Sequence, residues 1–242
     1  MEKVGAYSFS VEPYLSDFRG RATLPMLGNY LIHAASEHAA GRGFGFTDMS
    51  ENNTAWVLSR LAIEIKEYPK AGDSIIVYTW INEVGRLFTH RCFEIADASG
   101  KVYGYARSIW AAIDVNTRKP TALDIDALSI YLSDRPCPIE KPGKILPAES
   151  EGLSVNYKVK YSDLDINGHL NSIKYIEHLL DLFDKEKFEK QNVSRFEIAY
   201  QAEGRYGMDL LLYKKEMANQ SQYCMAIAND EKVICRAMAK WE

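Results

Sequence analysis

The sequence predicts an α+β protein in which a helix followed by an antiparallel sheet occurs twice. A helical pattern followed by four strand-like runs appears before residue 115 and again after residue 152. Proline fixes φ and supplies no ladder donor. Five of the eight prolines lie between these two stretches, at Pro120, Pro136, Pro138, Pro142 and Pro147. We therefore expect a first domain at 1–115, a connector at 116–152 and a second domain at 153–242.

In the first half we expect a leading strand at residues 9–14 and a helix at about 24–42. One face of this helix carries residues at helical spacing, namely Leu27, Leu31, Ala34, Ala35 and His38. Runs rich in Ile, Val, Tyr, Phe and Trp follow, separated by turn signals such as Ser99-Gly100. They predict strands at 56–68, 74–83, 88–97 and 102–114. The connector is mostly irregular, with a short helical turn expected around 125–132.

The second half repeats this order. A strand is expected at 155–161 and a helix at about 171–189, with Ile173, Ile176, Leu180 and Phe183 on one face. Strands are then expected at 194–202, 209–217, 221–228 and 233–241. Local details also match, since GDSIIVYTW in the first half resembles MDLLLYKKE in the second.

A single helix before four long strands can bury its apolar face only within the curve of that sheet. This is the hotdog arrangement, and two copies in one chain predict a tandem, or double, hotdog. The alternative is an unrelated α+β protein whose halves look alike because all antiparallel meanders look alike.

Charge and composition argue against several classes of function. The 242-residue chain has a net charge of −4. Residues 1–150 carry 16 Lys and Arg against 18 Asp and Glu, and residues 151–242 carry 13 against 15, so neither part is basic. Nucleic-acid binding is therefore not expected. The uncharged stretch 22–36 is too short and too polar to span a bilayer, so no membrane insertion is expected either.

The cysteines and the N-terminal residues point to a cytoplasmic protein. Cys92, Cys137, Cys224 and Cys235 form no CxxC motif and no Cys/His cluster, so no metal site is expected. Scattered cysteines fit reduced, buried thiols. The first residues show no basic region followed by an apolar core, the mark of a signal peptide. Without a GxGxxG or GxxxxGK[ST] motif, no cofactor is expected.

The segment DLDINGHLN, residues 163–171, carries the strongest functional signal. Asp165, Asn167, His169 and Asn171 alternate in a loop between a strand and a helix. A helix-start loop needs only one polar capping group, and Asn171 could be no more than that cap. Three further polar groups at alternating positions exceed the need, so Asp165, Asn167 and His169 are candidate catalytic residues.

Two stretches of the sequence resemble one family. Residues 161–176 are similar to the motif WSDLDxNxHxNxxKYI of the acyl-ACP thioesterases of plants and bacteria, and residues 53–80 are similar to that family's WVVTRMQVxVxxYPxWGDxVxVxTW. The likeness extends from about Phe9 to the C-terminus. It implies a double hotdog and a cofactor-independent thioester hydrolase that acts on fatty acyl chains carried by acyl carrier protein.

The resemblance also implies a set of catalytic residues. The family's Asp, Asn and His fall on Asp165, Asn167 and His169. The segment IAYQAEGRYG is similar to the family's LEYRRECGRD, and the shared Tyr-x-x-Glu places the catalytic Glu at Glu203, although a register set on Gly204-Arg205 would place Ala202 there. Gly204 stands where many relatives have a Cys, so a Cys nucleophile is not expected at that place.

Hydrolysis of a thioester needs a base for water, a donor for the oxyanion and release of a thiolate. Carboxylates, an Asn amide and a His can supply these groups, and a backbone N–H at the start of the following helix could add a donor. The first half has Asp17 in its matching loop but no Asn or His at that spacing, so it is expected to form the acyl pocket rather than to catalyse.

Other functions remain open on the sequence alone. The chain could be an acyl-CoA thioesterase of the same fold or a non-catalytic acyl-binding module. A hotdog dehydratase is disfavoured because its Asp-x-Asn-Pro-x-His pattern is absent. The expected partner is acyl carrier protein with its acyl chain, and a homodimer is possible.

Overall fold

A computed structural model describes residues 2–147, 153–218 and 221–242. The chain divides into two compact units, Met1–Lys141 and Pro142–Glu242. The division falls within the segment expected to be the connector, of which residues 148–152 lie outside the described residues.

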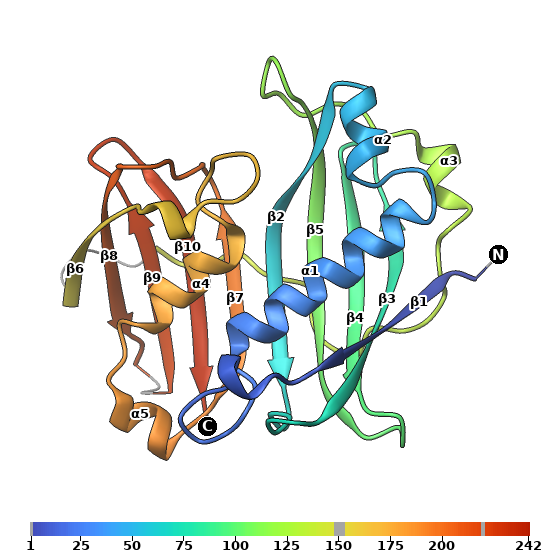
Figure 1. Ribbon diagram of the computed structural model, residues 1–242. Coiled ribbons are helices and arrows are strands. Elements are labelled where there is room, and N and C mark those ends of the chain that lie inside the picture. Colours follow the sequence, from blue (N-terminus) through green and yellow to red (C-terminus); the bar gives the residue numbers. More distant parts are fainter. Residues whose placement is uncertain (1, 148–152, 219–220) are drawn as a thin grey trace. The chain divides into compact units, whose positions relative to one another are not determined.

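The first unit is a five-stranded antiparallel sheet with a long helix across one face (Figure 1). Its strands follow the order β1-β3-β4-β5-β2, and neighbouring strands pair in antiparallel register. Its elements are β1 (Val4–Ser10), α1 (Leu24–Ala40), α2 (Phe46–Glu51), β2 (Thr54–Ile65), β3 (Ser74–Val84), β4 (Phe88–Ala96), β5 (Val102–Asp114) and α3 (Ile125–Ser129).

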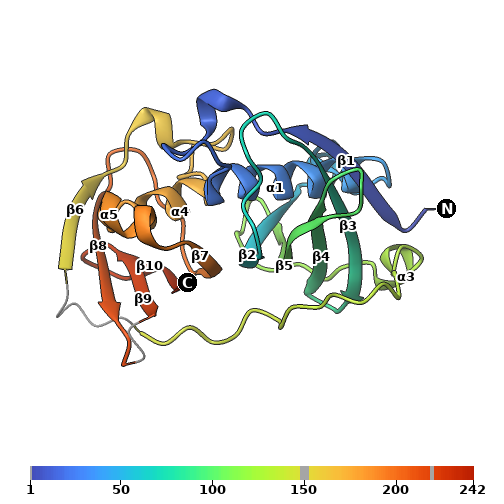
Figure 2. The same cartoon turned by 90° about the horizontal axis from the view of Figure 1, so that it is seen from below.

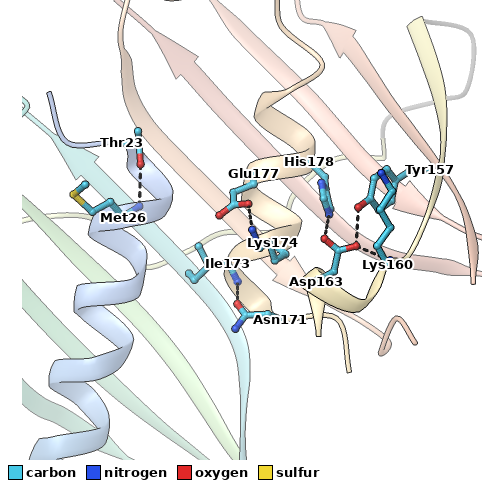
Figure 3. Close-up of polar contacts among 10 residues, drawn as sticks. All are labelled: Thr23, Met26, Tyr157, Lys160, Asp163, Asn171, Ile173, Lys174, Glu177 and His178. Atoms are coloured by element: carbon cyan, nitrogen blue, oxygen red, sulfur yellow. Dashed lines mark hydrogen bonds and ion pairs between the residues drawn. The ribbon is translucent and has the colours of Figure 1, made fainter. Parts of the chain in front are cut away.

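Helix α1 begins and packs as its sequence predicts. The Thr23 hydroxyl accepts a hydrogen bond from the Met26 N–H (3.1 Å; Figure 3), which satisfies one of the free donors at the helix start. The residues expected on its apolar face are all buried: Leu27, Leu31, Ala34, Ala35 and His38. Burial of this face against the sheet is the main source of the helix's stability in the fold.

The second unit repeats this plan, with strand order β7-β10-β9-β8-β6 and antiparallel pairing throughout. Its elements are β6 (Leu153–Lys158), a 3₁₀ turn (Tyr161–Asp163), α4 (Ser172–Leu180), α5 (Lys185–Lys190), β7 (Val193–Tyr200), β8 (Asp209–Glu216), β9 (Gln222–Ala228) and β10 (Val233–Trp241). Helix α4 packs on β8 and β9. Each unit is a hotdog, and the predicted α+β double hotdog is confirmed.

Three elements differ from the sequence-based expectation. The leading strand, expected at 9–14, is β1 at Val4–Ser10, and Pro13 begins a 3₁₀ turn instead. Proline lacks the N–H that a strand needs for pairing. The strand expected at 155–161 ends at Lys158. Helix α2 was not predicted.

The helix expected at 171–189 is two helices. Helix α4 ends at Leu180, and α5 begins at Lys185 after Asp184 in the N-cap position. Leu182 and Phe183 between them are buried.

Among the residues that the structure describes, no helix is long and apolar enough to cross a membrane.

Candidate active site

The segment from Asp163 to Asn171 forms a closed loop that is held by its own polar groups. Asp165 Oδ1 accepts hydrogen bonds from the N–H groups of Asn167 (2.8 Å) and His169 (3.1 Å). The Asp165 N–H donates to the His169 carbonyl (2.8 Å), and the Gly168 N–H donates to the Asp165 carbonyl (3.0 Å). Gly168 has φ 74°, a left-handed conformation that glycine adopts without strain. Asp165 therefore shapes the loop that carries the other candidate residues.

The loop is fastened to the segment that follows β7, and this brings His169 to Glu203. The Leu170 N–H donates to the Gly204 carbonyl (2.9 Å), and His169 forms an isolated antiparallel bridge with Arg205. His169 Nε2 lies 3.3 Å from Glu203 Oε2, and both side chains are partly exposed. Of the two registers that the sequence allowed, the structure places Glu203 rather than Ala202 against the imidazole.

The two asparagines of the motif have different positions. Asn167 lies at the exposed tip of the loop. Asn171 is the N-cap of α4, where its Oδ1 accepts from the Ile173 N–H (2.8 Å; Figure 3). Asn171 is thus the helix cap that the sequence allowed.

Gly204 is enclosed by side chains. A Cβ added there would lie 3.0 Å from Leu170 Cβ and 3.2 Å from the Tyr175 hydroxyl. The Gly204 N–H donates to that hydroxyl at 2.8 Å. A cysteine at this position would need Leu170 or Tyr175 to move, so the glycine matches its surroundings.

A cluster of polar groups around the buried Asp163 was not predicted from the sequence. The carboxylate of Asp163 accepts hydrogen bonds from the Tyr157 hydroxyl (2.6 Å) and the Lys160 N–H (2.7 Å), and its other oxygen lies 3.2 Å from His178 Nε2 (Figure 3). The Asp163 carbonyl also accepts from the Asn171 N–H (2.8 Å). Asp163 therefore joins β6, α4 and both ends of the loop.

The cluster perturbs the ionisation of its members. Burial raises the pKa of the Asp163 carboxyl, but the Tyr157 hydroxyl, the Lys160 N–H and His178 outweigh it and bring that pKa below its usual value. Burial lowers the pKa of His178, although the Asp163 carboxylate opposes this effect. The only sequence signal for the cluster was a second carboxylate two residues before Asp165 and a histidine within α4.

The first unit contains a loop with the same backbone hydrogen bonds. Asp17 Oδ1 accepts from the N–H groups of Arg19 (2.8 Å) and Arg21 (2.9 Å). The Asp17 N–H donates to the Arg21 carbonyl (2.8 Å), and the Gly20 N–H donates to the Asp17 carbonyl (2.9 Å). Gly20 has φ 68°. Asp17, Arg19 and Arg21 thus occupy the places of Asp165, Asn167 and His169.

The chemical groups in this first loop are different. Arg21 Nη2 forms an ion pair with Asp17 Oδ2 (2.9 Å), and its guanidinium lies 5.3 Å from the centre of the Tyr68 ring. The Ala22 N–H donates to the Pro69 carbonyl (2.8 Å), as Leu170 does to Gly204, so Tyr68 stands in the place of Glu203. The first loop keeps the fold of the second without its imidazole–carboxylate pair.

Comparison with known proteins gives a consistent result. The family model for the acyl-ACP thioesterase N-terminal domain matches residues 2–131, and that for the C-terminal domain matches residues 147–242. An acyl-[acyl-carrier-protein] hydrolase of Cuphea viscosissima is 28% identical over 240 residues, which is 91% of this chain and 57% of that protein. An oleoyl-acyl carrier protein thioesterase of Arabidopsis thaliana is 28% identical over 81% of this chain and 59% of its own. The chain spans about half the length of the curated relatives it matches.

Solved structures agree with these matches. An acyl-ACP thioesterase from Bacteroides thetaiotaomicron is 45% identical, with a TM-score of 0.94 over 99% of this chain and 98% of that one. The 12:0-ACP thioesterase from Umbellularia californica shares the fold at 21% identity, with a TM-score of 0.86 over 100% of this chain and 98% of its own. With both family domains matched in order and the repeated loop in place, the chain belongs to the acyl-ACP thioesterase family.

Proposed function

We propose that this protein hydrolyses fatty acyl thioesters of acyl carrier protein to free fatty acid and carrier thiol. Membership of the family supports the reaction class, and the names of its relatives supply the carrier. The observation on which the proposal rests is the contact between His169 Nε2 and Glu203 Oε2 (3.3 Å), beside the loop shaped by Asp165.

In the proposed reaction, the His169–Glu203 pair removes a proton from a water molecule as its oxygen attacks the thioester carbonyl carbon. The tetrahedral oxyanion then collapses, the C–S bond breaks, and the proton passes to the leaving sulfur. A carboxylate beside an imidazole orients the ring and stabilises its protonated form, which is the requirement for such a base.

The side chain of Asn167 is the proposed donor to the oxyanion. The sequence also offered a backbone N–H at the helix start as a donor, but the N–H groups of Leu170, Asn171, Ile173 and Lys174 already donate within the protein. Asn167 lies at the exposed tip of the loop, where its amide can reach a bound carbonyl. Asp165 holds the loop that presents both groups.

Thiol release from a panel of acyl-ACP and acyl-CoA substrates tests this function. Glu203→Gln, Asn167→Ala and His169→Ala should each lower kcat by roughly 10²-fold or more, since general-base and oxyanion contributions are of that size. Asp165→Ala should do the same by releasing the loop. Normal turnover in Glu203→Gln would contradict the assignment of the base.

Asp17→Ala is the matched control for Asp165→Ala. It removes the same two backbone contacts, to residues 19 and 21, from the equivalent loop of the first unit. We propose that the first unit is non-catalytic, so Asp17→Ala should leave kcat unchanged. Equal losses in the two variants would show that Asp165 acts through stability alone. A preference for acyl-CoA over acyl-ACP would identify the other thioesterase class.

We further propose that the first unit forms the acyl pocket, around α1 and β2. Leu31 lies on the buried face of α1, as Leu179 does on α4. Leu31→Ala should shift the preferred acyl length towards longer chains, because each methylene buried contributes about 0.8 kcal/mol. Leu179→Ala is the control and should lower stability without changing the ranking of chain lengths. An unchanged ranking in Leu31→Ala would place the pocket elsewhere.

The cytoplasmic location and the homodimer remain predictions. The plant relatives carry names that place them in the chloroplast. Cell fractionation checks the first prediction, and light scattering of the purified protein checks the second.

A further inference from the structure

Residues 133–137, in the middle of the connector, lie on the face of the first sheet opposite α1 (Figure 2). The Ser133 N–H donates to the Ile81 carbonyl, and the Trp80 indole N–H donates to the Arg135 carbonyl, both at 2.9 Å. Arg135 also forms an ion pair with Glu94 (2.7 Å). This segment therefore lies directly on β3 and β4.

Cys137 of this segment meets Cys92 of β4. Arg91 points towards α1, because its Nη1 lies 3.1 Å from His38 Nδ1, so the next residue, Cys92, faces the connector. Cys137 Sγ lies 3.8 Å from the Ala106 carbonyl on β5, where Arg107 is the registered partner of Cys92. The two thiols lie close enough that each affects the ionisation of the other. The four cysteines are scattered in the sequence, but the fold brings the thiols of Cys92 and Cys137 together.

Arg107 supplies a positive charge to this pair. Its guanidinium lies close enough to both sulfurs to affect their ionisation. Its Nε is buried and has no hydrogen-bond partner among the residues that the structure describes. A positive charge beside a thiol stabilises the thiolate form and so lowers the pKa of that thiol.

The two thiols are unequal. The neighbouring Cys92 thiol and the Arg107 guanidinium lower the pKa of the Cys137 thiol, against the opposing effect of burial. The Cys137 thiol and burial raise the pKa of Cys92. Cys137 is half-buried, whereas Cys92 is fully buried. Cys137 thus has the properties of a thiolate that attacks a disulfide. Cys92 has those of a second thiol that resolves the resulting mixed disulfide.

We propose that Cys137 and Cys92 form a redox-active site for small-molecule disulfides, in which Cys137 attacks and Cys92 resolves. The Cys137 thiolate attacks one sulfur of the small disulfide, whose S–S bond breaks and releases one thiolate. The Cys92 sulfur then attacks Cys137 Sγ in the mixed disulfide, whose S–S bond breaks. The second small thiolate leaves and takes up the Cys92 proton. The two protein thiols are oxidised to one disulfide, and the small disulfide is reduced to two thiols.

The remaining cysteines provide an internal contrast. Cys224 and Cys235 are both buried, and burial raises the pKa of each thiol. For Cys235 it rises to about 12. Their thiolate fractions at neutral pH are therefore small, and they should react slowly with the same reagent.

Incubation of the folded protein with oxidised glutathione, followed by intact mass and peptide mapping, tests the site. The wild type should lose two hydrogen atoms and yield a peptide pair that joins residues 92 and 137. Cys92→Ser should stop at the glutathione mixed disulfide on Cys137. Cys137→Ser should form neither product, and the control Cys224→Ser should behave as the wild type.

Two further measurements test the role of Arg107 and the order in which the cysteines react. Arg107→Gln should slow modification of Cys137 by roughly tenfold, since the charge beside it favours the thiolate. A short pulse of iodoacetamide on the wild type alone should label Cys137 before the other three cysteines. Labelling of Cys224 first, or a disulfide that forms equally in Cys137→Ser, would overturn the proposal. None of these measurements depends on the hydrolase activity.

Discussion

At the scale of single residues, the site depends on side chains that hold backbone in place. Asp165 and Asp163 each accept several hydrogen bonds from neighbouring N–H or O–H groups. The hydrogen bonds of both carboxylates therefore fix the conformation of the loop. That conformation places His169 in contact with Glu203.

A substitution at Gly204 tests how closely the side chains around this residue are packed. Gly204→Ala should lower the free energy of unfolding by about 1–3 kcal/mol, because the new methyl group would press on Leu170 and the Tyr175 hydroxyl. Chemical denaturation measures the loss. A Gly204→Ala/Leu170→Ala double variant should lose less than the sum of the two single variants. Additive losses would contradict the contact.

Tyr157 tests the cluster around Asp163. Tyr157→Phe removes one hydrogen bond to a buried carboxylate, so we expect a loss of about 1.5–3 kcal/mol in the free energy of unfolding. Tyr161→Phe is the control, since Tyr161 is 84% exposed. If both variants unfold at the same denaturant concentration as the wild type, the cluster does not stabilise the unit.

At the scale of secondary-structure elements, α1 carries a buried histidine that responds to pH. Burial, with Arg91 and Arg42 nearby, lowers the pKa of His38 to about 3. The unfolded chain holds this proton below about pH 6.5 and the folded chain does not. Folding is therefore favoured above pH 6.5, and this stability is lost as pH falls from there towards 3.

Denaturation at pH 7 and pH 5 measures this effect. The wild type should be less stable at pH 5, with a slope that approaches about 1.4 kcal/mol per pH unit. His38→Gln should show a smaller slope, because the glutamine does not titrate. The exposed His33→Gln variant serves as the control on the same helix. Equal slopes in all three proteins would show that His38 is not the responsible group.

At the scale of the whole molecule, the proposed acidic carrier needs a basic docking surface near the loop. The side chains of Arg195 and Lys214 make contacts within the protein, so we do not assign them to this surface. Arg195 pairs with Glu197 at 2.7 Å, and the Lys214 ammonium lies 4.2 Å from the centre of the Phe183 ring. Lys158, Lys160 and Arg205 are exposed near the loop. Lys158 also lies 3.6 Å from Asp209, and Arg205 lies 4.0 Å from Glu203.

Reversing these charges should affect the carrier more than the acyl chain. Lys158→Glu/Lys160→Glu should raise KM for acyl-ACP far more than for acyl-CoA. The effect should fall with added salt, since charges are screened over about 8 Å at physiological ionic strength. Lys70→Glu/Lys119→Glu, two exposed cations of the first unit, is the control. Equal increases for both substrates would place the docking surface elsewhere.

The sequence by itself determined the order of the strands and of the main helix in each half, the repeat and the identity of the loop. The apolar face of α1 and the range of β10 follow from spacing along the chain, and Asn171 caps α4 through a neighbouring N–H. These features depend on residues a few positions apart, whose geometry local backbone preferences largely set.

Only the tertiary structure decided which distant residues meet. It placed Glu203 rather than Ala202 against His169, His178 against Asp163 and Cys137 against Cys92. It also divided the expected long helix into α4 and α5. Such contacts depend on strand register and on where loops return to the sheet, and a shift of one residue reverses the direction of every side chain in a strand.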